Sequence, residues 1–105
     1  MLLLNIDYIP GKEIVESLGL VKGNVVMSEH FGKDFMAGMK TLVGGEIKSY
    51  TDMLNESRQI AMKRMVDEAQ ALGADAVINI RYASASIMQS AAEVIAYGTA
   101  VKIKG

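Results

Sequence analysis

Residues 44–82 decide the fold of this chain, and they read GGEIKSYTDMLNESRQIAMKRMVDEAQALGADAVINIRY. A glycine pair opens the stretch, a long run with helical periodicity follows, and Gly73 stands where glycine commonly ends a helix. The apolar run after it is typical of a buried strand. The stretch therefore predicts a long helix over residues 49–72 and, directly after it, an adjacent strand over residues 76–82.

The expected helix is apolar around more of its circumference than a surface helix needs. An ordinary amphipathic helix carries an apolar stripe of about 100° or somewhat more. Here the apolar arc covers well over half of the circumference, and its members are Met53, Leu54, Ile60, Ala61, Met62, Met65, Val66, Ala69 and Leu72. We expect one side of this helix to pack on its own sheet and the neighbouring side to pack on a second copy of the chain.

Charged residues inside this apolar arc form the candidate ligand site. Arg58, Arg64 and Glu68 fall within the arc at 100° per residue. Arg64 and Glu68 are four residues apart and can pair on one helix face. Arg81 lies in the strand expected next to the helix. Because a charge in apolar surroundings needs a partner, these side chains either grip an anionic ligand or form salt bridges within or between protomers.

The N-terminal part of the chain predicts strands. Residues 2–9 indicate a short first strand, and the Pro-Gly pair at residues 10–11 indicates a turn. Residues 14–28 indicate either one long bent strand or a tight hairpin. Gly19 and Gly23 lie inside this run, where glycine marks a bulge or the close approach of another backbone.

The remaining segments complete an α+β fold in which a small antiparallel sheet packs with one long and one short helix. Apolar spacing in residues 29–43 predicts the short helix. Residues 83–92 are small and polar and predict a connection, and residues 93–103 predict the last strand. One face of that strand is small enough for a second backbone to approach it, and it consists of Val94, Ala96, Gly98 and Ala100. We expect residues 1–105 to form a single domain.

Composition excludes several classes of protein. The chain has 105 residues, half of them hydrophobic, although a chain of this length buries only about two-thirds of its unfolded surface. The interspersed charges, with a net charge of −1, leave no basic footprint for nucleic acid. The apolar run at residues 1–4 is too short for a signal peptide or a membrane span. We therefore expect a cytoplasmic protein that has neither a nucleic-acid nor a membrane partner.

The residues that carry chemistry form no catalytic constellation. There is no cysteine, which excludes disulfides, thiolate nucleophiles and cysteine metal sites. The single histidine, His30, has no nucleophile at a matching spacing, and the glycine pair lacks the lysine and the serine or threonine of a phosphate-binding loop. We assign no catalytic residue, no cofactor and no metal ligand. Metal binding through symmetry-related copies of His30 is left as an alternative.

Three stretches of the chain resemble one bacterial family. Residues 42–82, residues 93–103 (EVIAYGTAVKI) and residues 10–26 (PGKEIVESLGLVKGNVV) are similar to the YbjQ-like family, whose members are labelled heavy-metal-binding domains. The resemblance implies a compact α+β protomer, similar to a dodecin subunit, that assembles into a ring-like homopentamer with short extra strands joining neighbours. It implies no established reaction. We therefore expect a homo-oligomeric binding or scaffold protein. A small anionic-ligand binder or enzyme with a site at protomer junctions is the alternative.

Overall fold

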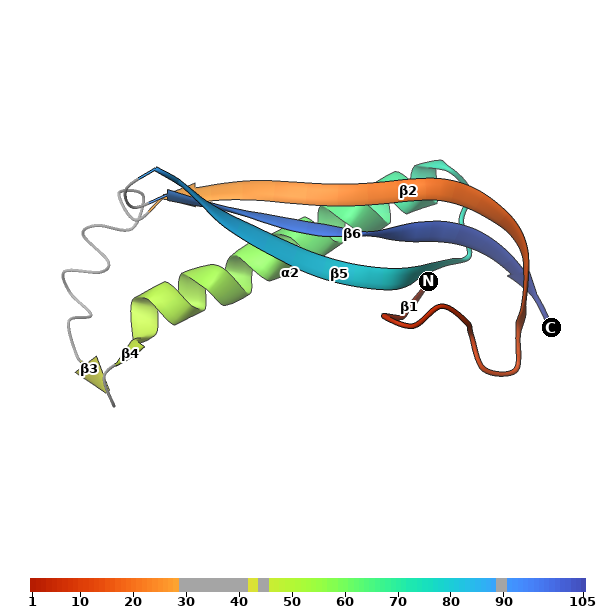
Figure 1. The fold of residues 1–105 in the computed structure, drawn as a ribbon, viewed down its shortest axis with the longest axis horizontal. Coiled ribbons are helices and arrows are strands. Elements are labelled where there is room, and N and C mark those ends of the chain that lie inside the picture. The colour runs from red at the N-terminus through yellow and green to blue at the C-terminus, as the bar shows by residue number, and fades with distance from the viewer. Residues whose placement is uncertain (29–41, 44–45, 89–90) are drawn as a thin grey trace.

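A computed structural model describes residues 1–28, 42–43, 46–88 and 91–105, and in it one long helix lies across one face of a four-stranded mixed sheet (Figure 1). The strand order in the sheet is β1-β5-β6-β2, and β3 and β4 form a separate two-stranded sheet. The elements are β1 (Leu2–Leu3), β2 (Glu13–Ser28), β3 (Leu42–Val43), β4 (Glu46–Ile47), α2 (Lys48–Ala71), β5 (Ala76–Met88) and β6 (Ala91–Lys104).

The main sheet is mixed, which corrects the prediction of an antiparallel sheet. β6 is central and pairs antiparallel with both β2 and β5, as predicted for the long strands. β1, however, pairs parallel with β5, and its backbone contacts continue to Leu4, whose N–H donates to the Val77 carbonyl oxygen at 3.0 Å. The N-terminal segment lies along the start of β5, where Leu2 pairs with Ala76 and Leu3 with Val77, and both strands run in the same direction there.

β2 is one bent strand and not a hairpin, and each of its interior glycines has a structural reason. The register with β6 shifts between Ile14 and Glu16 and between Ser17 and Gly19, and Gly19 has a φ of 98°. A Cβ added at Gly23 would collide with the Ala61 carbonyl oxygen and with backbone of the next helical turn. The predicted bulge and the predicted close approach of another backbone are both confirmed.

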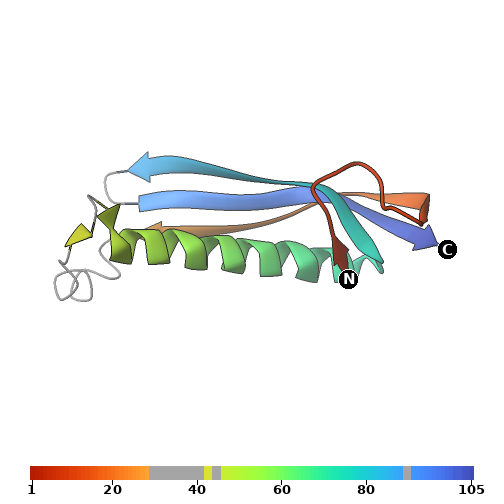
Figure 2. The same ribbon diagram turned by 90° about the horizontal axis from the view of Figure 1, so that it is seen from below.

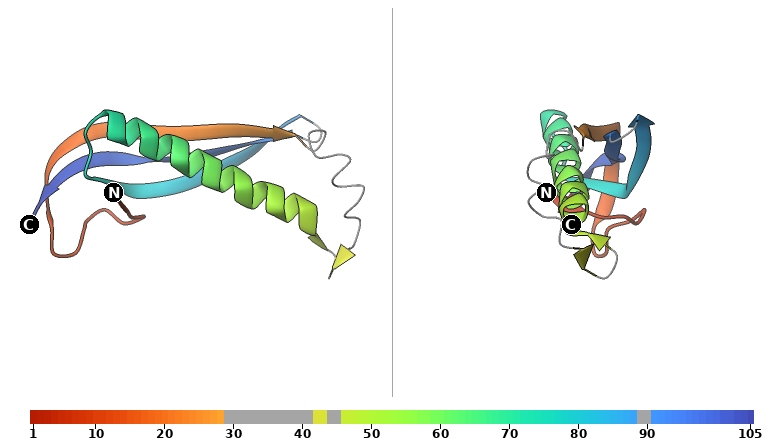
Figure 3. Two further views of the ribbon diagram at one scale, coloured as in Figure 1. Left: turned by 180° about the vertical axis from the view of Figure 1, so that it is seen from behind. Right: turned by 90° about the vertical axis from the view of Figure 1, so that its left-hand side faces the viewer.

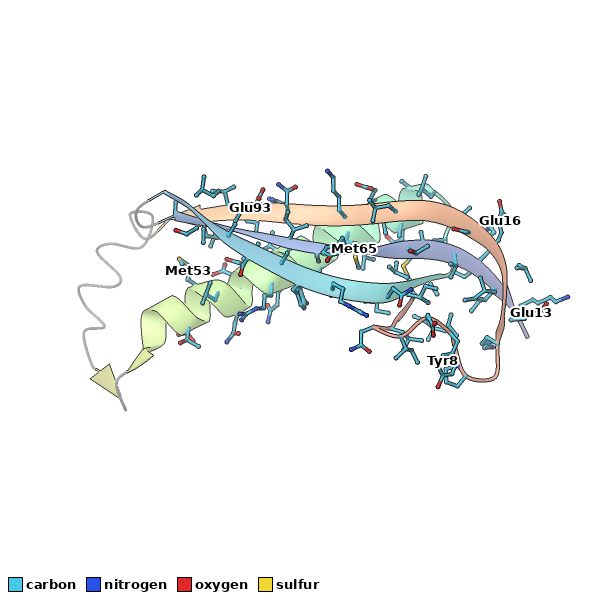
Figure 4. All side chains as sticks on the ribbon, in the orientation of Figure 1. Tyr8, Glu13, Glu16, Met53, Met65 and Glu93 are labelled. Carbon is cyan, nitrogen blue, oxygen red and sulfur yellow. The ribbon has the colours of Figure 1, made fainter. Side chains whose placement is uncertain are left out.

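The long helix packs on β2 and β6, and the main core lies between them (Figures 2 and 3). Its observed bounds, Lys48–Ala71, match the prediction to within a residue at each end. Gly73 ends it with a φ of 78° and donates its N–H to the Gln70 carbonyl oxygen at 2.9 Å. The buried helix face carries Ala61, Met65 and Ala69, all fully inaccessible to solvent. Figure 4 places Met65 where α2 crosses the sheet and Met53 on the part of α2 that diverges from it.

The small face of β6 is covered by this helix and not by a second chain, which corrects its interpretation as a surface for another backbone from outside. Val94, Ala96 and Ala100 belong to the main core together with Ala61 and Ala69. Alanines on both partners and the missing side chain at Gly23 bring the helix axis close to the sheet. At the point of closest approach, where Gly23 meets Ala61, there is room for no side chain, and larger residues such as Met65 and Val25 fill the core on either side.

Two other predictions need correction. Residues 83–92 are not a connection, because β5 continues to Met88 and β6 begins at Ala91. Pairing with β6 completes the backbone ladder there, and this tertiary contact outweighs the weak strand preference of alternating alanine and serine. The short helix predicted over residues 29–43 lies mostly outside the described residues, although its last two residues form β3. Within the described part of the chain α2 is the only helix.

A smaller core lies on the opposite face of the sheet, under the N-terminal segment. It contains Ile9, Ala76, Ile78 and Val101. Ile80 nevertheless belongs to the main core under the helix, although simple alternation would place it beside Ile78. The register shift between Ile78 and Arg81, with a φ of 54° at Asn79, inserts an extra residue and switches the faces of β5.

Candidate functional site

The candidate residues Arg64 and Arg81 lie at opposite borders of the sheet. Arg64 reaches the outer edge of β2, where its Nη1 donates to the Asn24 carbonyl oxygen at 2.7 Å. Arg81 lies on β5, and its Nη1 donates to the carbonyl oxygens of Asn5 at 2.8 Å and Ile80 at 3.0 Å. β6 separates the two strands, which are therefore about 10 Å apart. One protomer does not bring these two guanidinium groups to a common site.

Arg58 and Glu68 are exposed side chains on α2. The Nη1 of Arg58 donates to Oδ1 of Asn55 at 3.1 Å, one turn earlier in the helix. Arg64 and Glu68 form no ion pair, since Arg64 extends towards β2 instead. The ion pairs within the described residues are Lys63–Asp67 and Lys104–Glu13. The candidate arginines are therefore held by neutral oxygen acceptors, and none of them is neutralised by a carboxylate in the described part of the protomer.

Ser57 is the one buried polar side chain among the described residues, and its bonding is local. It is fully buried on α2, and its hydroxyl donates to the Met53 carbonyl oxygen at 2.7 Å. A serine hydroxyl bonded to the carbonyl four residues earlier is a common way to satisfy this group inside a helix. Ser57 is therefore a packing residue with its hydrogen bond made and is not a nucleophile aimed at a site.

The sheet face away from α2 is the surface that the sequence reasoning did not single out, and we call it the open face. Leu20 and Val26, 69% and 56% exposed, belong to it, and Asn24 donates from Nδ2 to Oε2 of Glu93 there at 3.2 Å. Strand register sets its rows, which are Lys22–Tyr97–Arg81, Asn24–Ile95–Ala83 and Val26–Glu93–Ala85. A signal for it exists in β2, where Val25 and Val26 are adjacent and therefore point to opposite faces.

A model of the family described as "Putative heavy-metal-binding" matches residues 1–104. The chain belongs to the YbjQ family. UPF0145 proteins from Fervidobacterium nodosum and Clostridium novyi are similar to it. The first is 62% identical over 99% of this chain and 96% of its own length, and the second is 65% identical over 98% and 99%.

A solved structure has the same fold as this YbjQ-family chain. It is the crystal structure of a protein of unknown function, assigned to the DUF74 family, from Pediococcus pentosaceus. The two chains superpose with a TM-score of 0.68, and the match covers 99% of this chain and 98% of the other. At 18% identity the likeness concerns the fold alone.

The donor groups of this YbjQ-family chain do not fit the heavy-metal description. Soft metals prefer thiolate and thioether sulfur. The sequence contains no cysteine, and methionines such as Met65, Met62 and Met27 belong to or pack against the main core. The part of the chain that the structure describes has no group of three or more His, Asp or Glu side chains placed to hold an ion. The single histidine, His30, lies outside the described residues.

The helix in the described part of the chain is α2. It is not apolar enough over its length to cross a bilayer.

Proposed function

We propose that this YbjQ-family chain acts as a homo-oligomeric binding or scaffold protein, assembled as a ring-like homopentamer in the cytoplasm. The observation that carries the proposal is the open face, where large apolar side chains have no cover from the described protomer. Leu20, Val26 and Tyr97 are exposed there among the polar side chains of Lys22, Asn24, Arg81 and Glu93. A mixture of exposed apolar and polar side chains on one face is typical of the interfaces between protein chains.

The shape of the protomer supports the same proposal. Its radius of gyration is 16.9 Å, whereas a compact chain of this length has about 13 Å. Its accessible surface is 6778 Å², whereas a compact monomer of 11.3 kDa has about 5,700 Å². The chain therefore exposes more surface than a compact monomer of its mass, and packing against further copies would bury part of this excess. Packing of several copies side by side would lower the accessible surface of each elongated chain.

Light scattering coupled to size exclusion tests the proposal. The expected molar mass is near five times that of the 11.3 kDa chain at micromolar concentration. A single-chain mass that persists as the protein is concentrated would contradict the homo-oligomer. A stable dimer or hexamer would keep the oligomer and reject the five-membered ring.

A second candidate function is the binding of a small anion at protomer junctions, by Arg58, Arg64 and Arg81 with Glu68 beside them. The observation that favours it is that the guanidinium groups have no carboxylate partner in the described protomer. When copies stand side by side in a ring, Arg64 at the β2 border of one chain would come close to Arg81 at the β5 border of the next. Each junction then gathers positive charge from two chains.

Titration calorimetry with inorganic phosphate tests this second candidate. We expect heat of binding from the assembled protein, and its loss in Arg58→Ala and Arg81→Ala variants of unchanged molar mass. Lys63→Ala is the matched control, because Lys63 is also a helix cation but is paired with Asp67 at 3.0 Å. Phosphate binding that survives both arginine substitutions would reject the site.

A further inference from the structure

One row of the open face places an aromatic ring between two cations. Tyr97 lies on the central strand β6, where it pairs with Lys22 of β2 on one side and with Arg81 of β5 on the other. Paired residues on neighbouring strands have Cβ atoms about 5 Å apart on the same face of the sheet. All three side chains are exposed. We call Lys22, Tyr97 and Arg81 the central row.

The two cations of the central row are not neutralised by a carboxylate from the described residues. The ion pairs in that part of the chain are formed by other side chains. The acidic residue in the rows of this face, Glu93, lies two rows away and accepts a hydrogen bond from Nδ2 of Asn24 at 3.2 Å. Figure 4 shows Glu93 near the end of the sheet that is remote from Tyr8. The row therefore carries two positive charges that an anion complements.

Backbone oxygens hold the Arg81 guanidinium in a fixed place. Its Nη1 donates to the carbonyl oxygens of Asn5, at 2.8 Å, and Ile80, at 3.0 Å. Both bonds use Nη1, and Nη2 and Nε form no hydrogen bond with any described residue. A guanidinium has five N–H donors in a rigid fork that matches the oxygens of a carboxylate or phosphate. Because the group is already ordered, it loses little conformational freedom when it binds an anion.

The Tyr97 ring is exposed among apolar neighbours. Its nearest neighbour along β6 on the same face is the half-buried Ile95, and its diagonal neighbours are Leu20 on β2 and Ala83 on β5. Ala83 presents only a methyl group beside Arg81. The Tyr97 hydroxyl forms no hydrogen bond with the described residues. An exposed aromatic ring with apolar and small neighbours is suited to stack with another flat ring.

We propose that the central row binds a small planar aromatic anion. The ligand's ring stacks on Tyr97, its anionic group bonds to the fork of Arg81, and Lys22 on the other side of the ring supplies the second positive charge. A phosphate ester of an aromatic nucleoside and an aromatic carboxylate share this chemistry.

The site belongs to a single chain, because all three side chains come from one sheet. It therefore does not rest on the proposed assembly or on the phosphate site proposed at its junctions. Leu20 and Val26, which the proposed assembly covers, lie in other rows of the open face.

Titration calorimetry of the wild-type protein tests the ligand class. The aromatic anions are adenosine monophosphate and benzoate, and their controls, inorganic phosphate and acetate, carry the same anionic group without a ring. We expect at least one aromatic anion to bind about tenfold or more tightly than its control, because it contacts the ring as well as the cations. The pair in which this difference occurs identifies the anionic group as phosphate or carboxylate. Equal affinities within both pairs would overturn the proposal.

Tyrosine substitutions test where this ligand binds. Tyr97→Leu should weaken the binding of the aromatic anion about tenfold, whereas Tyr97→Phe keeps the ring and should keep the affinity. Tyr82→Leu is the matched control, because Tyr82 is also exposed on the sheet but pairs with Ala96 and therefore stands on the other face. A Tyr97→Leu variant with wild-type affinity, or a Tyr82→Leu variant that loses as much, would refute the site.

The outcomes separate this site from the proposed functions. Arg58 lies on α2, away from the central row, so Arg58→Ala should abolish binding at the junction site and leave the affinity for the aromatic anion unchanged. A single-chain molar mass would reject the proposed assembly, but it would not affect the contrast between the Tyr97 and Tyr82 variants.

If Tyr97→Leu does not fold, nuclear magnetic resonance spectra of the wild type decide. The ring-proton signals of Tyr97 should shift when the aromatic anion is added, and those of Tyr82 should stay in place. Tyr97 signals that do not move would overturn the proposal.

Discussion

The two faces of the sheet differ in a way that residue size alone would not suggest. The face under α2 carries Ala96, Ala100 and Gly23, and all of them are buried. The open face carries the larger Leu20 and Val26, and both are more than half exposed. The covered face carries small residues where the helix backbone lies closest, at Gly23 and its neighbour Ala96, and larger ones such as Val25 beside them. Small residues therefore lie where α2 approaches the sheet most closely, whereas the large exposed residues Leu20 and Val26 lie on the face that we propose a partner covers.

The largest expected effect is from a charge on the covered face. Ala96→Asp places a carboxylate where solvent does not reach, beneath α2. We expect a loss of more than about 4 kcal/mol in the free energy of unfolding, enough to unfold a small domain. Circular dichroism of the purified variant would show the loss of helix, and a folded variant with wild-type ellipticity would contradict this view of the covered face.

The next effect concerns the helix side of the same contact. Met65→Ala empties a fully buried site and should lower the free energy of unfolding by about 3 kcal/mol. Met62→Ala is the matched control, because Met62 is only half-buried beside the core. Urea unfolding at one fixed protein concentration measures both variants. Equal losses would mean that α2 is rotated relative to the structure.

A smaller effect is expected where the helix touches the strand backbone. A Cβ in Gly23→Ala collides with backbone atoms of α2, so the helix must move, at a cost of about 2 kcal/mol. Gly11→Ala is the control, since nothing lies near its added Cβ and only the left-handed φ of 76° opposes it, at about 1 kcal/mol. A Gly23 variant as stable as wild type in the same unfolding assay would refute the close approach.

The smallest effect on stability, and the sharpest test of the comparison, is a charge on the open face. Leu20→Asp changes a side chain that is 69% exposed and should alter the stability of the isolated protomer by no more than about 0.5 kcal/mol. The same substitution should lower the molar mass of the proposed assembly in light scattering. If the mass is unchanged while Ala96→Asp unfolds the chain, the open face is a free surface and not a joint between protomers.

The candidate site was less predictable than the elements that carry it. The helical period places Arg58, Arg64 and Glu68 within one wide arc, but the arc says nothing about the direction in which a long side chain extends. Arg64 is drawn to the Asn24 carbonyl oxygen on β2, forty residues away in the chain. Arg81 is turned towards the N-terminal segment, after a register shift that alternation does not anticipate. Arg64 and Arg81 therefore lie at opposite borders of the sheet, and Arg58 and Glu68 stay exposed on α2.

The sequence by itself determined the long helix and its glycine end, because these depend on local periodicity and on glycine backbone freedom, whereas it left residues 14–28 open between one strand and a hairpin. Only the tertiary structure decided which face of the sheet the helix covers, since β2 is apolar on both faces and the choice depends on Gly23 meeting Ala61. It also decided that residues 83–88 form a strand and that β1 runs parallel to β5. Those outcomes follow from hydrogen bonds between segments distant in the chain, which no local pattern contains.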